Sequence, residues 1–110
     1  MEPATRQLRL FAFPIAFLSV LPSIVYAQGA GTEWETLNKE VMDLYRAGDY
    51  GRAVVIAQKA LRIAEQNVGP DHPDVATTLE NLARLYRATN RNAEAKALER
   101  RAARIRAIKR

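Results

Sequence analysis

An internal repeat of 42 residues constrains the fold of this 110-residue chain more than any other feature. Within each half of the repeat, apolar residues have the spacing of one helix face. Repeats of this length are typical of stacked helical hairpins. We therefore expect an all-α fold of two similar hairpins. The six repeated pairs are Leu37 and Leu79, Val41 and Ala83, Leu44 and Tyr86, Ala53 and Ala95, Ala60 and Ala102, and Ile63 and Ile105.

Glycines and polar residues mark the expected ends of the helices. Thr32 and Glu35 have the spacing of a capping box for the first helix. Gly48 can end this helix, and a second helix is expected to begin near Tyr50. The last two helices are expected over about residues 73–89 and 91–109, which gives repeats over about residues 33–69 and 73–109.

The segment GPDHPD, residues 69–74, contains the only histidine of the chain. A metal ion needs further converging ligands beside His72 and its neighbouring aspartates, and the chain has no second histidine and no cysteine. His72 also lacks a nucleophile that it could activate as a general base. In contrast, Gly69 can end a helix in a left-handed conformation, Asp71 can cap the next helix, and Pro73 suits its first turn. The segment therefore indicates a junction between two helices, with no metal ligand and no catalytic residue.

Residues 1–27 have the layout of a secretory signal peptide. Two arginines precede an uncharged, mostly apolar run that ends in the small residue Ala27. We expect cleavage between Ala27 and Gln28, followed by a glycine-containing linker over residues 28–32. The remainder of the chain is then exported, to the periplasm or out of the cell.

Retention of this segment as a membrane anchor is the alternative to cleavage. The uncharged run over residues 10–27 lies at the short end of what can span a bilayer. The absence of cysteine excludes both a disulfide and a lipid attached to a cysteine at the cleavage site. Export without disulfides favours a bacterial periplasm.

The sequence over residues 44–95 is similar to a known family. It reads LYRAGDYGRAVVIAQKALRIAEQNVGPDHPDVATTLENLARLYRATNRNAEA and resembles tetratricopeptide repeats of the kinesin-light-chain type, which have a 42-residue period. The resemblance extends over about residues 35–106. It implies two antiparallel helix hairpins stacked as a short right-handed solenoid.

Four positions of the second repeat depart from the family pattern. Asn90 and Asn92 stand where the family has a glycine and a tyrosine, and asparagine also tolerates a left-handed turn. Glu99 and Ala103 replace the Ala57 and Leu61 of the first repeat. A last helix that gains polar residues is typical of the cap of a repeat array. We therefore expect the last helix to act as a polar cap.

The resemblance also implies a function, because the first helix of each hairpin in this family lines a concave wall that binds extended peptides. Asn81 would bond the backbone of a peptide, and Arg84 and Arg87 would pair with acidic side chains or a C-terminal carboxylate. The alternative, that these side chains are solvated surface, stays open. The candidate partner-binding residues are Asn38, Met42, Tyr45, Thr77, Asn81, Arg84 and Arg87.

Two repeats leave one face of the first hairpin without a neighbour, because such arrays generally need about three repeats. Trp34, Leu37 and Val41 are the apolar residues expected to be exposed there. The sequence therefore predicts either a homo-dimer through the first hairpin or a partner that covers it.

The last helix is strongly basic, with seven lysines and arginines after residue 95 against one acid, Glu99. Such a helix could bind anionic lipid headgroups or support self-association, although cations also complement a helix C-terminus without any partner. Nucleic acid is not an expected partner, since no aromatic residues interleave the cations. The chain has no phosphate-binding loop and no nucleophile with a base, so we expect a non-enzymatic protein without a cofactor.

Overall fold

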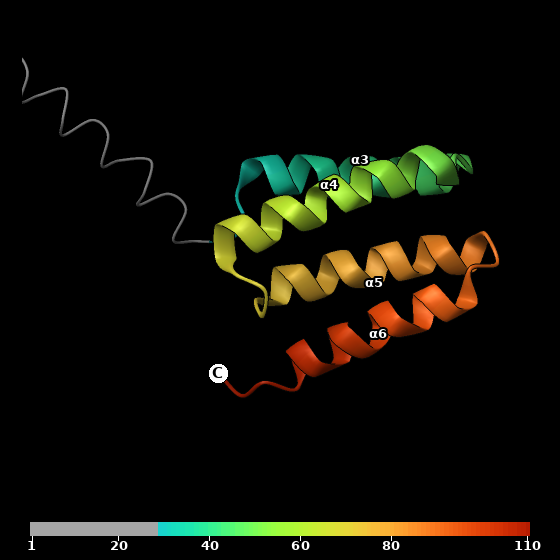
Figure 1. Cartoon of the computed structure of the whole chain (residues 1–110). Helices are drawn as coiled ribbons and strands as arrows, with labels where there is room; N and C mark the ends of the chain where they lie inside the picture. The colour runs from blue at the N-terminus through green and yellow to red at the C-terminus, as the bar shows by residue number, and fades with distance from the viewer. Residues whose placement is uncertain (1–28) are drawn as a thin grey trace, which may run out of the picture.

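The structure is a computed structural model and describes residues 29–110 (Figure 1). This part of the chain folds into helices that run antiparallel, each packed against the next. The all-α prediction of two stacked hairpins is confirmed. The predicted signal peptide and its cleavage site lie outside the described residues. The helices are α3 (Thr32–Ala47), α4 (Tyr50–Val68), α5 (Pro73–Ala88) and α6 (Asn92–Arg106).

Equivalent residues of the two hairpins occupy equivalent places. Leu37 and Leu79 are both buried, as are Ala53 and Ala95. Ile63 is only half-buried although its counterpart Ile105 is buried. The difference has a physical cause, because α5 adds apolar residues such as Val75 around Ile105, whereas the equivalent position of α3 carries a charged side chain.

The core lies where the two hairpins meet. The buried residues of α4 are all alanines, whose small side chains allow α5 to approach closely. α5 supplies the large side chains, among them Leu79, Leu82 and Leu85. Each buried leucine of this kind contributes about 1.5–3 kcal/mol through removal of apolar surface from water. α5 therefore holds the two hairpins together.

The helices begin and end close to where they were expected, except that α6 ends at Arg106 instead of about residue 109, and two predicted caps are wrong. α3 begins at Thr32 with Gly31 as its N-cap, and no side chain caps this end, so the predicted capping box is wrong. At the junction between the hairpins the cap is His72 instead of Asp71. Its Nδ1 accepts a hydrogen bond from the backbone N–H of Asp74 at 3.0 Å.

The two turns within the hairpins have the predicted left-handed geometry, whereas Gly69 between the hairpins does not. Gly48 adopts the left-handed conformation with a φ of 80°, and Asn90 does the same at 64° where the first repeat has this glycine. Asparagine therefore replaces glycine at the second turn, as expected from its tolerance of positive φ. Gly69 also has a positive φ, 86°, but its ψ of 166° is extended.

Residues 29–31 are more than the predicted linker. Ala30 is 1% exposed and packs among residues of α4, α5 and α6. Its backbone N–H donates to Asp74 Oδ2 at 3.1 Å, and its carbonyl accepts from Asn67 Nδ2 at 2.6 Å. These contacts tie the start of α3 to the junction between the hairpins.

The first hairpin does not expose the apolar residues that were expected there. Leu37 and Val41 are buried, and Trp34 is half-buried with its Nε1 donating to Thr78 Oγ1 at 2.8 Å. They are covered because they face α4, α5 and residue 30 instead of the outer side. The apolar argument for a dimer through the first hairpin therefore loses its basis.

Candidate partner-binding surface

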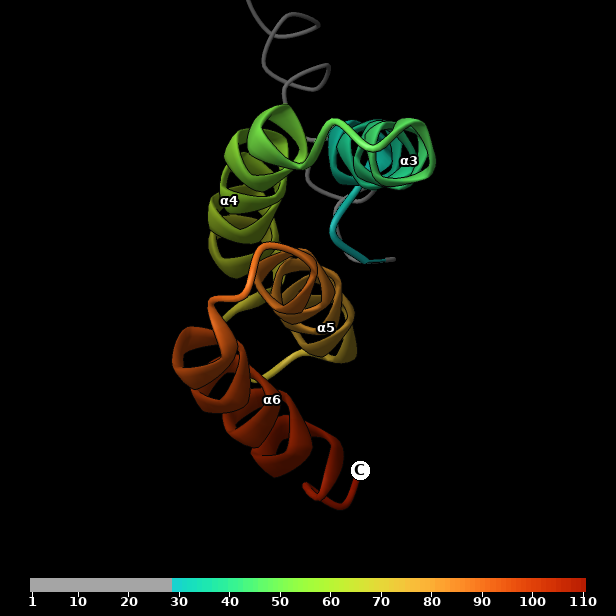
Figure 2. The same ribbon diagram turned by 90° about the vertical axis from the view of Figure 1, so that its right-hand side faces the viewer.

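The first helix of each hairpin lies on the same side of the stack. Figure 2 looks along the helices and shows α3 and α5 on one side, with α4 and α6 on the other. α5 contacts α4 along its length and touches α3 at fewer places. The two helices that carry the predicted binding residues thus form one continuous surface.

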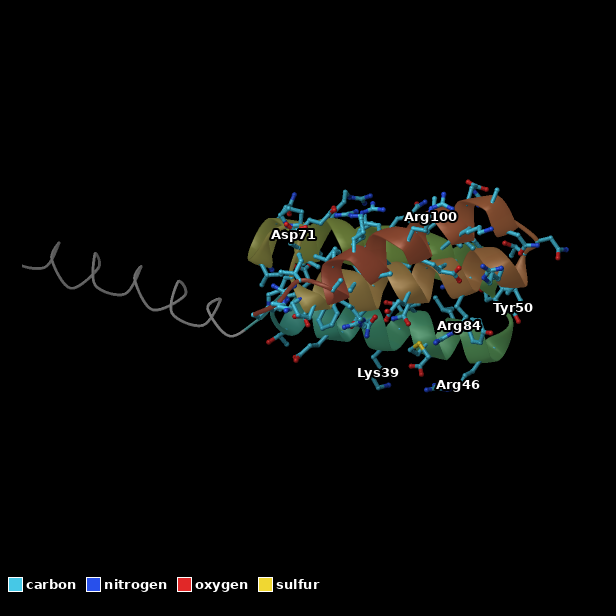
Figure 3. All side chains as sticks on the ribbon, turned by 90° about the horizontal axis from the view of Figure 1, so that it is seen from below. Lys39, Arg46, Tyr50, Asp71, Arg84 and Arg100 are labelled. Carbon is cyan, nitrogen blue, oxygen red and sulfur yellow. The ribbon has the colours of Figure 1, made fainter. Side chains whose placement is uncertain are left out.

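A hollow of about 590 Å³ lies on this surface and defines the candidate site. Three of the predicted residues line it, namely Tyr45, Arg84 and Arg87. Figure 3 shows Arg84 where α3 and α5 run side by side. The complete lining, which we call the α3–α5 hollow, is Tyr45, Glu80, Arg84, Arg87, Ala88 and Glu99.

Arg87 is engaged by a carboxylate of the chain itself. Its Nε and Nη2 donate to the two oxygens of Glu99 at 2.7 and 2.6 Å, a bidentate pair. The bond from Arg87 holds the pKa of Glu99 below its ordinary value of 4.5, and the same bond raises the pKa of Arg87. This pair therefore stabilises the fold above the ordinary pKa of Glu99, and its contribution is lost as the pH falls through the lowered value.

A second ion pair, between Arg106 and Glu80, joins α6 to α5 beside the hollow. Arg106 of α6 donates to Glu80 through Nε at 2.8 Å and through Nη2 at 2.9 Å. The same Nη2 donates to Thr77 Oγ1 at 3.1 Å. The bond from Arg106 lowers the pKa of Glu80. Thr77, a predicted binding residue, is thus held by the last helix and lies outside the hollow.

Arg84 has no carboxylate of its own. It is exposed and forms no ion pair with any residue in the range 29–110. Its charge acts through space on Glu80, whose pKa it helps to lower. Among the predicted arginines, Arg84 is therefore the one whose whole guanidinium can donate to a carboxylate of a partner.

Asn38, Met42 and Asn81 lie on α3 and α5 but do not line the hollow. Asn81 Nδ2 donates to Asn38 Oδ1 at 2.7 Å, which leaves the carbonyl oxygen of Asn81 for a ligand. Met42 is half-buried. The ring of Tyr45 packs against that of Tyr50, with centroids 5.4 Å apart. The predicted set is thus split between the hollow, an internal hydrogen bond and the core edge.

Sequence reasoning missed three residues of the hollow, Glu80, Ala88 and Glu99. The only signal was at Glu99, which replaces a buried alanine of the first repeat and was interpreted as a feature of the cap alone. Its pairing with Arg87 depends on how α5 and α6 pack, which helical spacing does not specify.

The structure shows no group of three acidic or histidine side chains that could hold a metal ion within residues 29–110. In the same part of the chain, none of the helices is both long and apolar enough to cross a membrane.

Comparison with known families gives a match over most of the chain. Residues 35–107 match a family model described as tetratricopeptide repeat. The match covers nearly all of α3 and the whole of the other three described helices. No curated protein matches the chain. The kinesin-light-chain type of the repeats stays a prediction.

Proposed function

Because the chain belongs to the tetratricopeptide repeat family, whose repeats generally mediate protein–protein interactions, we propose that it is a non-enzymatic module that binds an extended segment of a protein partner in the α3–α5 hollow. The observation that carries this proposal is Arg84, an exposed arginine that lines the hollow and forms no ion pair with residues 29–110. A single cation beside an aromatic ring is a suitable site for an acidic side chain or a C-terminal carboxylate.

The surroundings of Arg84 favour one carboxylate over an extended acidic run. Glu80 and Glu99 also line the hollow and would repel further negative charge, although each is neutralised in part by its own arginine. Tyr45 and Ala88 also line the hollow and supply apolar surface. The partner segment that fits best therefore carries one acidic group flanked by apolar residues.

Export of the chain is part of this proposal. The arginines and apolar run of residues 1–27 support removal of a signal peptide and a partner in the periplasm or outside the cell. If the segment is retained instead, it anchors the same binding surface at a membrane.

Association of the basic last helix with a membrane surface is a second candidate function. Three of the seven cations after residue 95, on α6 and just beyond it, are engaged within the chain: Arg101 with Glu65, Arg106 with Glu80, and Arg110 with the carbonyl oxygen of Asp71. Lys96, Arg100, Arg104 and Lys109 form no ion pair with residues 29–110, so they remain for anionic headgroups.

The binding of short peptides tests the primary proposal. The full chain is titrated against a peptide with one aspartate between apolar residues and against its asparagine counterpart, with fluorescence anisotropy as the readout. We expect Arg84→Glu to weaken binding of the aspartate peptide about tenfold or more, because a charge-assisted bond is lost and a repulsion replaces it.

Arg62→Glu is the matched control, since Arg62 is an exposed arginine of α4 away from the hollow. It changes the net charge equally and should leave the affinity within about twofold of the unsubstituted chain. If Arg84→Glu and Arg62→Glu weaken binding equally, the hollow is not the binding site.

A further inference from the structure

The two hairpins carry very different charges. Residues 32–69 contain five basic and six acidic residues, whereas residues 73–110 contain ten basic and four acidic residues. An asymmetry of this size between the halves of a small domain creates opposite potentials at its two ends.

The junction between the hairpins shows which residues an adjoining hairpin covers. Ala57 and Leu61 of α4 pack in one cluster with Leu82 and Leu85 of α5. Further along the same helices, Ala64 and Val68 pack in a second cluster that contains Val75. The junction is apolar on both sides.

A shift of 42 residues identifies the residues at the two free ends of the stack that are equivalent to those at the junction. The equivalent of Ala64 is Arg106, the last residue of α6, and the equivalent of Val68 is Arg110, which follows the end of that helix. We call the outer face of α6, together with the residues that follow this helix, the basic end; its junction-equivalent residues are Lys96, Glu99, Ala103, Arg106 and Arg110.

The outer face of α3 has the opposite character. The equivalents of Val75, Leu82 and Leu85 on α3 are all acidic. Glu33 and Glu40 are exposed and form no ion pair with residues 29–110, while Asp43 pairs on the surface with Lys39 and Arg46. We call this face the acidic end; its residues are Glu33, Glu40 and Asp43.

A second copy of the chain that repeats the junction would therefore bring opposite charges together. Glu33 of one copy would meet Arg106 and Arg110 of the other, where Val75 meets Ala64 and Val68 within one chain. Arg106 uses Nε and Nη2 in its bonds to Glu80 and Thr77, so its remaining N–H groups can donate to a second carboxylate.

Two more pairs follow from the same shift. The hydrogen bond between Asn38 and Asn81 becomes a contact between Glu80 of one copy and Lys39 of the other. Asp43 would lie near Lys96, since the equivalents of these two residues, Leu85 and Val54, pack in one cluster.

One contact in this arrangement is unfavourable. Glu40 would approach Glu99, because their equivalents Leu82 and Ala57 share a cluster. The charge of Glu99 is balanced by its bidentate bond to Arg87, which reduces the repulsion. The favourable pairs outnumber this contact.

From these observations we propose that the chain associates with a second copy of itself, with the acidic end of one copy on the basic end of the other. The contact is head-to-tail, so each added copy presents a new free end and the assembly is open-ended. It rests on the charges of the two ends and not on peptide binding by Arg84, although Glu80 and Glu99 lie both in the α3–α5 hollow and at this contact. Since the contact is polar and exposed, it is weak and strongly dependent on salt.

Sedimentation velocity of the full chain at several ionic strengths tests this proposal. We expect the average mass to rise with protein concentration at about 20 mM salt and to fall to that of the monomer at about 500 mM, where screening is nearly complete. Arg106→Glu with Arg110→Glu should abolish the association at low salt, and so should Glu33→Arg.

Mixing the two variants gives the decisive result. An equimolar mixture restores opposite charges at every contact, so association should return although each variant alone stays monomeric. Arg62→Glu with Arg104→Glu is the control of equal charge change. Arg62 is exposed even though its helix, α4, packs against α5 at the junction. Its equivalent on α6, Arg104, therefore lies outside the proposed contact.

Circular dichroism shows whether each variant keeps its helices. The proposal is overturned if folded variants associate as the unsubstituted chain does, or if the mixture stays monomeric. It is also overturned if the chain is monomeric at low salt while the substitutions at Arg106 and Arg110 reduce binding to anionic phospholipid vesicles, which would identify a membrane as the partner of the basic end.

Discussion

Two arginines on adjacent turns of α5 have different chemical roles. Arg87 donates through Nε and Nη2, one edge of its guanidinium, to both oxygens of Glu99, whereas Arg84 has no ion pair with residues 29–110. Both were predicted to bind a partner. In the structure only Arg84 has its whole guanidinium available, because Glu99 occupies the Nε and Nη2 groups of Arg87 and so competes with the carboxylate of a partner.

Removal of the charge of Glu99 should therefore improve binding. In Glu99→Gln, Arg87 loses its ion pair and becomes a second cation in the hollow, and we expect the affinity for the aspartate peptide to rise about two- to fivefold. Glu94→Gln, which removes a comparable exposed pair with Arg91 outside the hollow, is the control for net charge. Equal gains from the two substitutions would show that only the overall charge matters.

At the scale of helices, the periodic features of the fold could be predicted and the contacts between helices could not. Helical spacing and the glycine at the first turn located both hairpins, and the tolerance of Asn90 for positive φ located the second turn. The cap at His72 was missed, because an adjacent aspartate has an equally suitable acceptor. The burial of Ala30 was missed because it depends on groups from α4 and α5.

The same limit applies to the candidate site. The pair of Arg87 with Glu99 and the pair of Arg106 with Glu80 join side chains of α5 and α6. Their formation depends on the distance and rotation between the two helices, which are set by packing and not by the period of either helix.

The repeat makes a quantitative test of helix packing possible, because equivalent leucines lie in unequal surroundings. Leu79 of α5 is 0% exposed between two other helices, and Leu37 of α3 is 8% exposed at the end of the stack. We expect Leu79→Ala to lower the free energy of unfolding by about 3–5 kcal/mol and Leu37→Ala by about 2 kcal/mol. Urea denaturation measures both, and an equal or reversed order would contradict the central position of α5.

At the scale of the whole molecule, the stacking of the second hairpin on the first determines both the binding surface and the two ends of the stack. The step from the first hairpin to the second places α3 and α5 on one side, as Figure 2 shows, and forms the hollow between them. The same positions that form the apolar junction carry acids on α3 and mostly cations on α6. Apolar packing therefore holds the interior of the stack together, while interactions at its two ends depend on charge.

Two-dimensional NMR of the isotope-labelled full chain, titrated with the aspartate peptide, tests the central claim most directly. The account predicts that shifted backbone amides cluster on the α3–α5 side, around Tyr45, Arg84 and Ala88, and that the asparagine peptide produces much smaller shifts at the same amides. Shifts confined to the outer sides of α4 and α6, or equal shifts with both peptides, would contradict it.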